Sequence, residues 1–242
     1  MADQHPVPVF PEERIPAILS QLAGQAGQHY LGQLEQALRN EDLKTYAVHK
    51  HTHYYIGTQP EQDCTEVDLT ISVFQKPLLC LPRFTLGITQ GGELNDADVQ
   101  ASPEWARFIA TSRNQSNIYG LLCFVPGLEP KRSPYQAKLR ASVAGAWNPL
   151  RTGAEDTFTV GTCHPSFLDA VTVHFPPDAM QQQIEIYPID QQQRRLPENE
   201  RAAYATHIDR RGNRIVTYIA NAAEGVCTNH RFQLKLERQL PI

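Results

Sequence analysis

The segment that decides the fold runs from Tyr46 to Val73 and reads "YAVHKHTHYYIGTQPEQDCTEVDLTISV". Each end of the segment alternates between apolar and polar residues, whereas its centre, residues 57–64, is rich in residues that favour turns. Alternation over this length is typical of a strand with one buried face and one polar face. The segment therefore predicts two antiparallel strands joined as a β-hairpin.

The first predicted strand carries a histidine at every second position, namely His49, His51 and His53. Successive side chains of a strand point to opposite faces, so the three imidazoles share one face with Tyr55. The other face is more apolar, and we expect it to meet the core while the histidines point into solvent or a cleft. That apolar face carries Tyr46, Val48, Thr52, Tyr54 and Ile56, with Lys50 as an exception.

The register of this hairpin is limited by the need to keep both apolar faces on one side of the sheet. The simplest register pairs Tyr54 with Val67 and sets His53 opposite Asp68. Directly opposed side chains have Cβ atoms about 4.5–5.5 Å apart, so a contact between imidazole and carboxylate is expected. The same register pairs His51 with Thr70 and His49 with Ser72, and places Glu66 near Tyr55.

A third predicted strand, "RFTLGIT" (residues 83–89), adds Arg83 to this polar face. Imidazole, carboxylate and guanidinium groups on one surface can move protons near neutral pH or bind an anion. We therefore expect a small-molecule enzyme of lyase, isomerase, cyclase or hydrolase type with a His–carboxylate acid–base pair. The candidate catalytic residues are His51, His53, Asp68 and Glu66, and the candidate substrate-binding residues are Arg83, His49 and Tyr55.

Two other classes of function fit the same residues. The first is a non-catalytic module whose polar sheet face binds a ligand or a protein partner. The second is a metal-dependent enzyme, because two histidines two positions apart on a strand have Cα atoms about 6.6–6.8 Å apart and can share one ion. His49 and His53 are about 13 Å apart along an ideal strand, so all three histidines do not easily meet one ion. The cofactor is therefore unknown from sequence.

The rest of the chain predicts a mixture of helices and strands. Apolar residues recur at helical spacing in residues 15–22 and 30–38, and serine–proline starts predict helices at 102–110 and 133–147. A further helix is expected at 198–208. The segments "AVTVHF" and "QQIEIYPI" predict a second hairpin that sets His174 opposite Glu185. Other predicted strands are "IYGLLCFV", "TFTVGT", "RIVTYIA" and "RFQLKLE".

This order of elements predicts an α+β fold with largely antiparallel sheet and helices on one face. The 242 residues suit one domain, since single domains reach about 250 residues. The two halves, about 1–128 and 129–242, are similar in outline, which is compatible with a degenerate internal duplication. No residue-level repeat supports that duplication.

Composition excludes several classes of protein. Hydrophobic residues make up 41% and charged residues 20%, as in a soluble globular chain. The formal charge of −4 gives no general attraction to nucleic acid or to an anionic membrane. The five cysteines are scattered and the start resembles no signal peptide, so we expect a cytoplasmic protein without a disulfide framework. A small-molecule ligand is the expected partner, and a homo-oligomer is compatible with the sequence.

Overall fold

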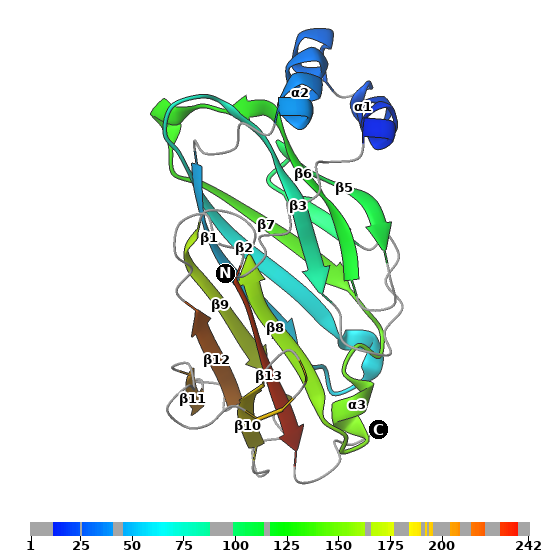
Figure 1. Ribbon diagram of the computed structural model, residues 1–242. Coiled ribbons are helices and arrows are strands. Elements are labelled where there is room, and N and C mark those ends of the chain that lie inside the picture. The colour runs from blue at the N-terminus through cyan, green and yellow to red at the C-terminus, as the bar shows by residue number, and fades with distance from the viewer. Residues whose placement is uncertain are drawn as a thin grey trace.

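A mixed seven-stranded sheet forms the centre of the fold, with β1 (Tyr46–Tyr55) and β2 (Cys64–Val73) near its middle (Figure 1). The computed structural model describes residues 12–24, 26–40, 46–87, 99–113, 117–162, 166–176, 184–189, 192, 194–195, 204–208, 214–220 and 228–236. From residue 204 onward only the backbone is described. The predicted α+β class with largely antiparallel sheet is confirmed. The internal duplication stays a prediction.

The order of strands in the large sheet is β11-β12-β9-β1-β2-β7-β4. Strands β1 and β9 run parallel, and every other strand pair among the described residues is antiparallel. The bounds of the other five strands are β11 (Tyr204–Ile208), β12 (Arg214–Ala220), β9 (Ser166–His174), β7 (Tyr135–Ser142) and β4 (Val99–Ser102).

Two three-stranded sheets accompany the large one. The first has the order β3-β6-β5 and the second the order β10-β13-β8. Their strands are β3 (Leu78–Gly87), β6 (Asn117–Leu128), β5 (Ala106–Arg113), β10 (Ile184–Ile189), β13 (Thr228–Leu236) and β8 (Asp156–Thr162). The α-helices are α1 (Ile15–Leu22), α2 (Gln28–Asn40) and the short α3 (Asn148–Arg151), and 3-10 turns occupy Glu12–Arg14, Pro60–Gln62 and Pro130–Arg132.

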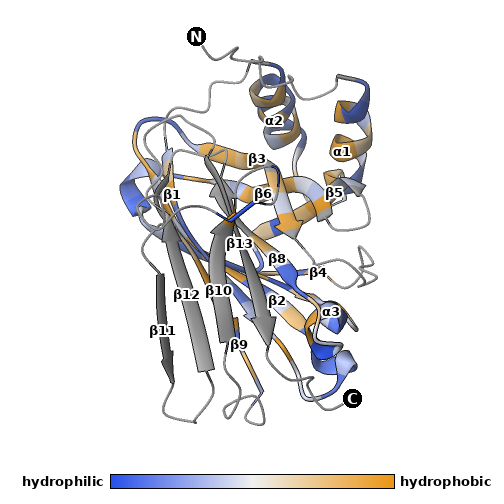
Figure 2. Cartoon of the chain, turned by 60° about the horizontal axis from the view of Figure 1, so that its bottom comes forward, coloured by the Kyte–Doolittle hydropathy of each residue, from blue (hydrophilic) through white to orange (hydrophobic). Residues whose placement is uncertain are grey.

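The apolar residues at alternate positions of the strands pack the sheets and helices into layers. The apolar face of β1, β2 and β7 packs against β3, β6 and β5, with Val48, Leu69 and Leu139 on one side and Phe84 and Leu122 on the other. The far side of β3, β6 and β5 is covered by α1 and α2. Figure 2 shows both helices beside these strands, with hydrophobic residues on the helices and on β3 and β5. The helices therefore lie on the side of the molecule away from the polar face of the large sheet.

A second apolar cluster fills the other half of the large sheet. Tyr54 and Val173 project from β1 and β9 toward Phe158 of β8 and Trp147, which precedes α3. Trp147 stacks on Phe158 with ring centroids 5.3 Å apart. No helix within the described ranges is both long and apolar enough to cross a membrane.

Two predicted helices are wrong. Residues 102–110 contribute the end of β4 and most of β5, and residues 133–147 contribute β7. In β7 the buried Ala137, Leu139 and Ala141 alternate with exposed residues, which is the period of a strand. Neighbouring residues of β5 likewise point to opposite faces of their sheet. Ile109 packs in the cluster beneath the helices, while Phe108 packs against the cluster between the sheets. Burial on both faces overrides the serine–proline start signal.

The predictions for the C-terminal third are also wrong in part. Residues 204–208 form β11 instead of the end of a helix, and residues 198–203 lie outside the described residues. The second hairpin is absent, because β9 pairs with β1 and β12 while β10 pairs with β13. His174 is therefore not opposite Glu185. Helix α1, helix α2 and the strands expected from alternating residues are confirmed.

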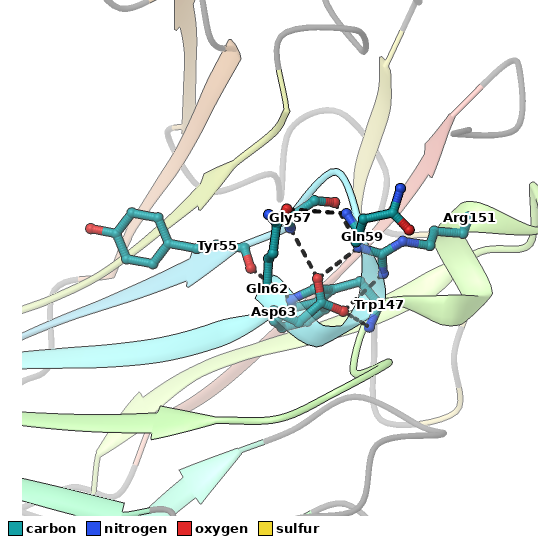
Figure 3. Close-up of polar contacts among 7 residues, drawn as sticks. All are labelled: Tyr55, Gly57, Gln59, Gln62, Asp63, Trp147 and Arg151. Atoms are coloured by element: carbon teal, nitrogen blue, oxygen red, sulfur yellow. Dashed lines mark hydrogen bonds and ion pairs between the residues drawn. The ribbon is translucent and has the colours of Figure 1, made fainter. Parts of the chain in front are cut away.

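A buried ion pair closes the connection between β1 and β2 (Figure 3). Arg151 donates from Nη2 to Asp63 Oδ1 over 2.7 Å and from Nη1 to Asp63 Oδ2 over 2.8 Å. The same carboxylate accepts hydrogen bonds from the backbone of Gly57 and Trp147, at 2.9 Å and 3.3 Å. Arg151 also donates to the carbonyl of Gly57, and the Trp147 indole donates to the carbonyl of Tyr55. These contacts hold together the end of β1, the start of β2 and α3.

Replacing Arg151 by methionine is expected to lower the free energy of unfolding by about 3–5 kcal/mol, because it leaves the Asp63 carboxylate buried without its counter-ion. The measurement is urea unfolding followed by circular dichroism. The matched control is Arg39→Met, which removes an exposed partner of Glu35 and is expected to cost less than about 0.5 kcal/mol. Equal stability of the two variants would contradict the structural role of the buried pair.

Candidate functional site

The polar face of the large sheet gathers charged and hydrogen-bonding side chains from four adjacent strands, β9, β1, β2 and β7. Because the opposite face meets the cores, these side chains lie away from the apolar clusters. Strand pairing arranges β1, β2 and β7 in rows across the sheet. The rows are His53–Glu66–Arg140, His51–Asp68–Lys138 and His49–Thr70–Gln136.

The predicted facing of β1 holds, but the predicted register is wrong by two residues. Tyr54 pairs with Thr65 instead of Val67, so His53 lies opposite Glu66 and not opposite Asp68. A shift by two keeps each side chain on its face, which is why the histidines and carboxylates still meet. The shift reflects the connection of residues 56–63, whose length is set by the contacts of its last residue, Asp63.

The contact between His53 and Asp68 exists in spite of the shifted register. Nε2 of His53 lies 3.4 Å from Oδ2 of Asp68, diagonally across the two strands. The His53 side chain is only 16% exposed, while that of Asp68 is 45% exposed. The carboxylate therefore lies between solvent and a largely covered imidazole.

Strand β9 brings a residue that sequence patterning assigned elsewhere. His174 pairs beside Tyr55 in the parallel register, and its Nε2 lies 3.1 Å from Nδ1 of His53. The Tyr55 ring stacks on His174 with centroids 4.2 Å apart and an interplanar angle of 11°. In the same way Thr172 Oγ1 lies 2.7 Å from Nε2 of His51. Strand β9 thus supplies a hydrogen-bonding partner to His51 and to His53.

These contacts assign the protons of the imidazoles. An ionised Asp68 only accepts hydrogen bonds, so the proton of a neutral His53 belongs on Nε2. Nδ1 of His53 is then an acceptor, and Nε2 of His174 must carry the proton that lies between them. Asp68, His53 and His174 therefore form one directional chain of hydrogen bonds.

Burial and crowding keep the central imidazoles uncharged. Burial, followed by the charges of the neighbouring His51 and His174, lowers the pKa of His53 to about 4, against the opposing effect of Asp68 and Glu66. Burial likewise lowers the pKa of His51, with Asp68 opposing. The rings of His51 and His53 are 3.9 Å apart, so two positive charges there would repel strongly. At pH 7 both groups are neutral.

Two cations on β7 complete the face and were missed by sequence reasoning. Lys138 Nζ lies 3.1 Å from Glu66 Oε2 and 3.2 Å from Asp68 Oδ1, while Arg140 Nη1 lies 3.3 Å from Glu66 Oε1. The hydrogen bond that Lys138 donates to Glu66 is the largest cause of the raised pKa of Lys138. Reading residues 133–147 as a helix concealed these side chains. The alternation of Gln136, Lys138 and Arg140 with buried residues was the signal that could have found them.

The remaining predicted site residues fall into two groups. Tyr55 joins the site through its stack on His174, and burial followed by Glu66 raises the pKa of its hydroxyl. His49 is exposed at the far end of the histidine row, opposite Thr70. Arg83 lies on β3, in a different sheet from β1 and β2, so the expectation that it shares their polar face is wrong. Its side chain is outside the described residues.

A shallow hollow of about 410 Å³ adjoins the carboxylate end of the hydrogen-bond chain. It lies over β2, β7 and the end of β4, and its walls combine polar side chains with apolar groups. The lining residues include Asp68, Thr70, Ser102, Gln136 and Lys138. A small polar molecule in this hollow would touch the same carboxylate that contacts His53.

The alternative of a metal-dependent enzyme gains nothing from the geometry. In the part of the chain that the structure describes, no three His, Cys, Asp or Glu side chains come together in a way that could hold an ion. His53 and His174 supply two nitrogens only, and His51 is turned toward Thr172.

Comparisons with known proteins add little to this site. No family model matches the chain, and no curated protein matches it in sequence. A structure of native yeast LTA4 hydrolase is 10% identical, with a TM-score of 0.34 over 79% of this chain and 29% of that one. A second structure, native leukotriene A4 hydrolase from Saccharomyces cerevisiae, is 8% identical, with a TM-score of 0.35 over 80% and 29%. The chain thus spans less than a third of those proteins, and the TM-scores are too low to bear on function.

The lowered pKa of His53 predicts a loss of stability in acid. The unfolded chain takes up a proton near the ordinary histidine pKa of about 6.5, while folded His53 resists until about pH 4. Between those values the unfolded state binds more protons, so the free energy of unfolding falls as the pH falls. From pH 7 to about 4.5, wild type is expected to lose roughly 1–2 kcal/mol more than His53→Gln, allowing for solvent screening.

The measurement is urea unfolding of both proteins at a series of pH values. His29→Gln, at an exposed position of α2, controls for the removal of any histidine. Identical pH dependence of wild type and His53→Gln would contradict the burial of a neutral imidazole at this position.

Proposed function

We propose that the polar face of the seven-stranded sheet is a small-molecule site that works by acid–base chemistry. The observation that carries the proposal is the chain of contacts from Asp68 through His53 to His174. A carboxylate that orients a neutral imidazole, which in turn contacts a second imidazole, is an arrangement suited to moving a proton in a defined direction. Lyase, isomerase, cyclase and hydrolase reactions all need such a step.

Each member of the chain has a role in this proposal. A proton taken from a ligand by His174 at Nδ1 lets its Nε2 proton pass to Nδ1 of His53. The imidazolium formed transiently at His53 is stabilised by Asp68 across 3.4 Å. In the resting state the low pKa of His53 keeps it neutral, with Nδ1 as the acceptor of the hydrogen bond from His174. His51 has a supporting role, because its charge state affects that of His53.

The acidic and basic residues beside the relay set its electrostatics. Glu66 is held by Lys138 and Arg140 and is only 13% exposed, so it is a fixed negative charge opposite His53. Lys138 also contacts Asp68 and lines the hollow, where it can attract an anionic group of a ligand. In this proposal Lys138 takes the anion-binding role that sequence patterning gave to Arg83.

A second candidate is a non-catalytic binding module. The openness of the sheet face and the shallow shape of the hollow favour a surface that holds a ligand or partner without enclosing it. A cytoplasmic location belongs with either candidate as a proposal, supported by the free thiols of Cys64, Cys80 and Cys123. Neither candidate calls for nucleic acid, given the net charge of −4.

Replacing His53 by glutamine is expected to abolish most proton-transfer catalysis by the protein. The probes are two model reactions limited by a base, the hydrolysis of p-nitrophenyl acetate and the ring opening of 5-nitrobenzisoxazole. Because a positioned acid or base contributes about 10²–10⁴-fold, the variant is expected to lose at least about tenfold in kcat/KM. His29→Gln is the control and is expected to match wild type.

A wild-type rate no greater than that of His53→Gln for both probes would count against the enzyme and favour the binding module. A separate measurement tests the contact between Asp68 and His53 without any substrate. Asp68→Asn is expected to loosen the preference of His53 for the Nε2-protonated form, because the amide can donate as well as accept. Imidazole ¹⁵N shifts that stay unchanged in this variant would show that Asp68 does not orient His53.

A further inference from the structure

Two cysteines face one another beneath the helical layer, far from the polar face. Cys80 on β3 pairs directly with Cys123 on β6, and both are free thiols. Directly opposed residues of antiparallel strands have Cα atoms about 4.5–5.5 Å apart, which is within the range of about 4.4–6.8 Å that a disulfide spans. The register therefore already brings the two backbones to the separation of a cross-strand disulfide.

The two thiols also lie on the same side of their sheet. Both belong to the apolar cluster that α1 and α2 form with β3, β6 and β5, and they are 2% and 0% exposed. Cys64 is different, because it lies on β2 opposite Tyr55 and Ser142 and has no cysteine beside it in the register. The arrangement at 80 and 123 is therefore that of a pair and not of an isolated buried thiol.

The helical layer controls access to this pair. Leu34 of α2 is fully buried over the cluster, and Tyr30 donates from its hydroxyl to the carbonyl of Leu79, next to Cys80. A further hydrogen bond runs from Arg14, just before α1, to the carbonyl of Thr111 on β5. A layer held mainly by apolar contacts can open locally without unfolding of the sheets.

We propose that Cys80 and Cys123 close to an intramolecular disulfide when α1 and α2 open and a low-molecular-weight disulfide reaches them. The thiolate of one cysteine attacks a sulfur of the oxidant, forming a mixed disulfide and releasing one small thiolate. The second cysteine then attacks the protein sulfur of the mixed disulfide and releases the second. The protein loses two protons and two electrons, and the oxidant is reduced to two thiols.

Burial explains why the two thiols react only when the helical layer opens. It raises the pKa of Cys80 to about 12 and that of Cys123 well above the ordinary value. The nucleophile in disulfide exchange is the thiolate, so neither cysteine reacts while the helices cover them. Opening of the helical layer both admits the oxidant and returns the thiols to water. The bond would then join β3 to β6, and it would form only in molecules whose helical layer had opened.

The test is incubation of the folded chain with oxidised glutathione, followed by peptide mapping without reduction. The expected product is a peptide linked between Cys80 and Cys123, in a chain lighter by two hydrogens. Cys64→Ser is expected to form the same link, whereas Cys80→Ser is expected to carry glutathione on Cys123 instead. Glutathione on both cysteines of the wild type, or a link from either to a different cysteine, would overturn the proposal.

The route through the helical layer is tested with two matched core variants. Leu34→Ala weakens the packing of α2 on the cysteine pair, while Leu139→Ala weakens the separate core between the sheets. We expect Leu34→Ala to speed formation of the bond by about tenfold or more relative to Leu139→Ala. Equal rates would refute opening of this layer, and Leu31→Ala replaces Leu34→Ala if that variant does not fold.

Discussion

The buried ion pair between Asp63 and Arg151 is the constraint on which the placement of the polar residues depends. It joins positions 88 residues apart and takes up both oxygens of a carboxylate that also receives the backbone N–H groups of Gly57 and Trp147. A connection of another length would leave some of these buried groups without partners, at a cost of about 1–3 kcal/mol each. The connection thereby sets the register, and the register sets which carboxylate each histidine meets.

The two faces of the large sheet are opposite in character and depend on each other. The apolar face is packed against strands and α3, which holds the backbone rigid. The polar face gains its order from that rigidity, because side chains such as His53 and Glu66 have their separation set by strand pairing. Three imidazoles lie close together there, so placing a positive charge on His53 is unfavourable. Functional sites often contain locally unfavourable arrangements of this kind.

Part of the candidate site could be predicted from local pattern. Alternation alone placed His51, His53, Glu66 and Asp68 on one face, and that facing survives a register error of two residues. The cations of β7 could not be placed once the segment was taken for a helix, since serine–proline starts and short apolar runs suit either structure. Arg83 was misplaced because consecutive strands need not share a sheet, and here β3 turns away to form the second layer.

Local periodicity was enough to establish the strands, the buried face of β1 and β2 and the helices α1 and α2, because a side chain's direction follows from backbone geometry within a few residues. The partners of each strand were a different matter. His174 reaches His53 only because β9 lies parallel to β1, 121 residues away along the chain. Such pairing depends on which distant apolar surfaces are buried together, and no local pattern contains that information. The imidazoles are therefore a property of the sequence, whereas their assembly into a chain of hydrogen bonds is a property of the folded sheet.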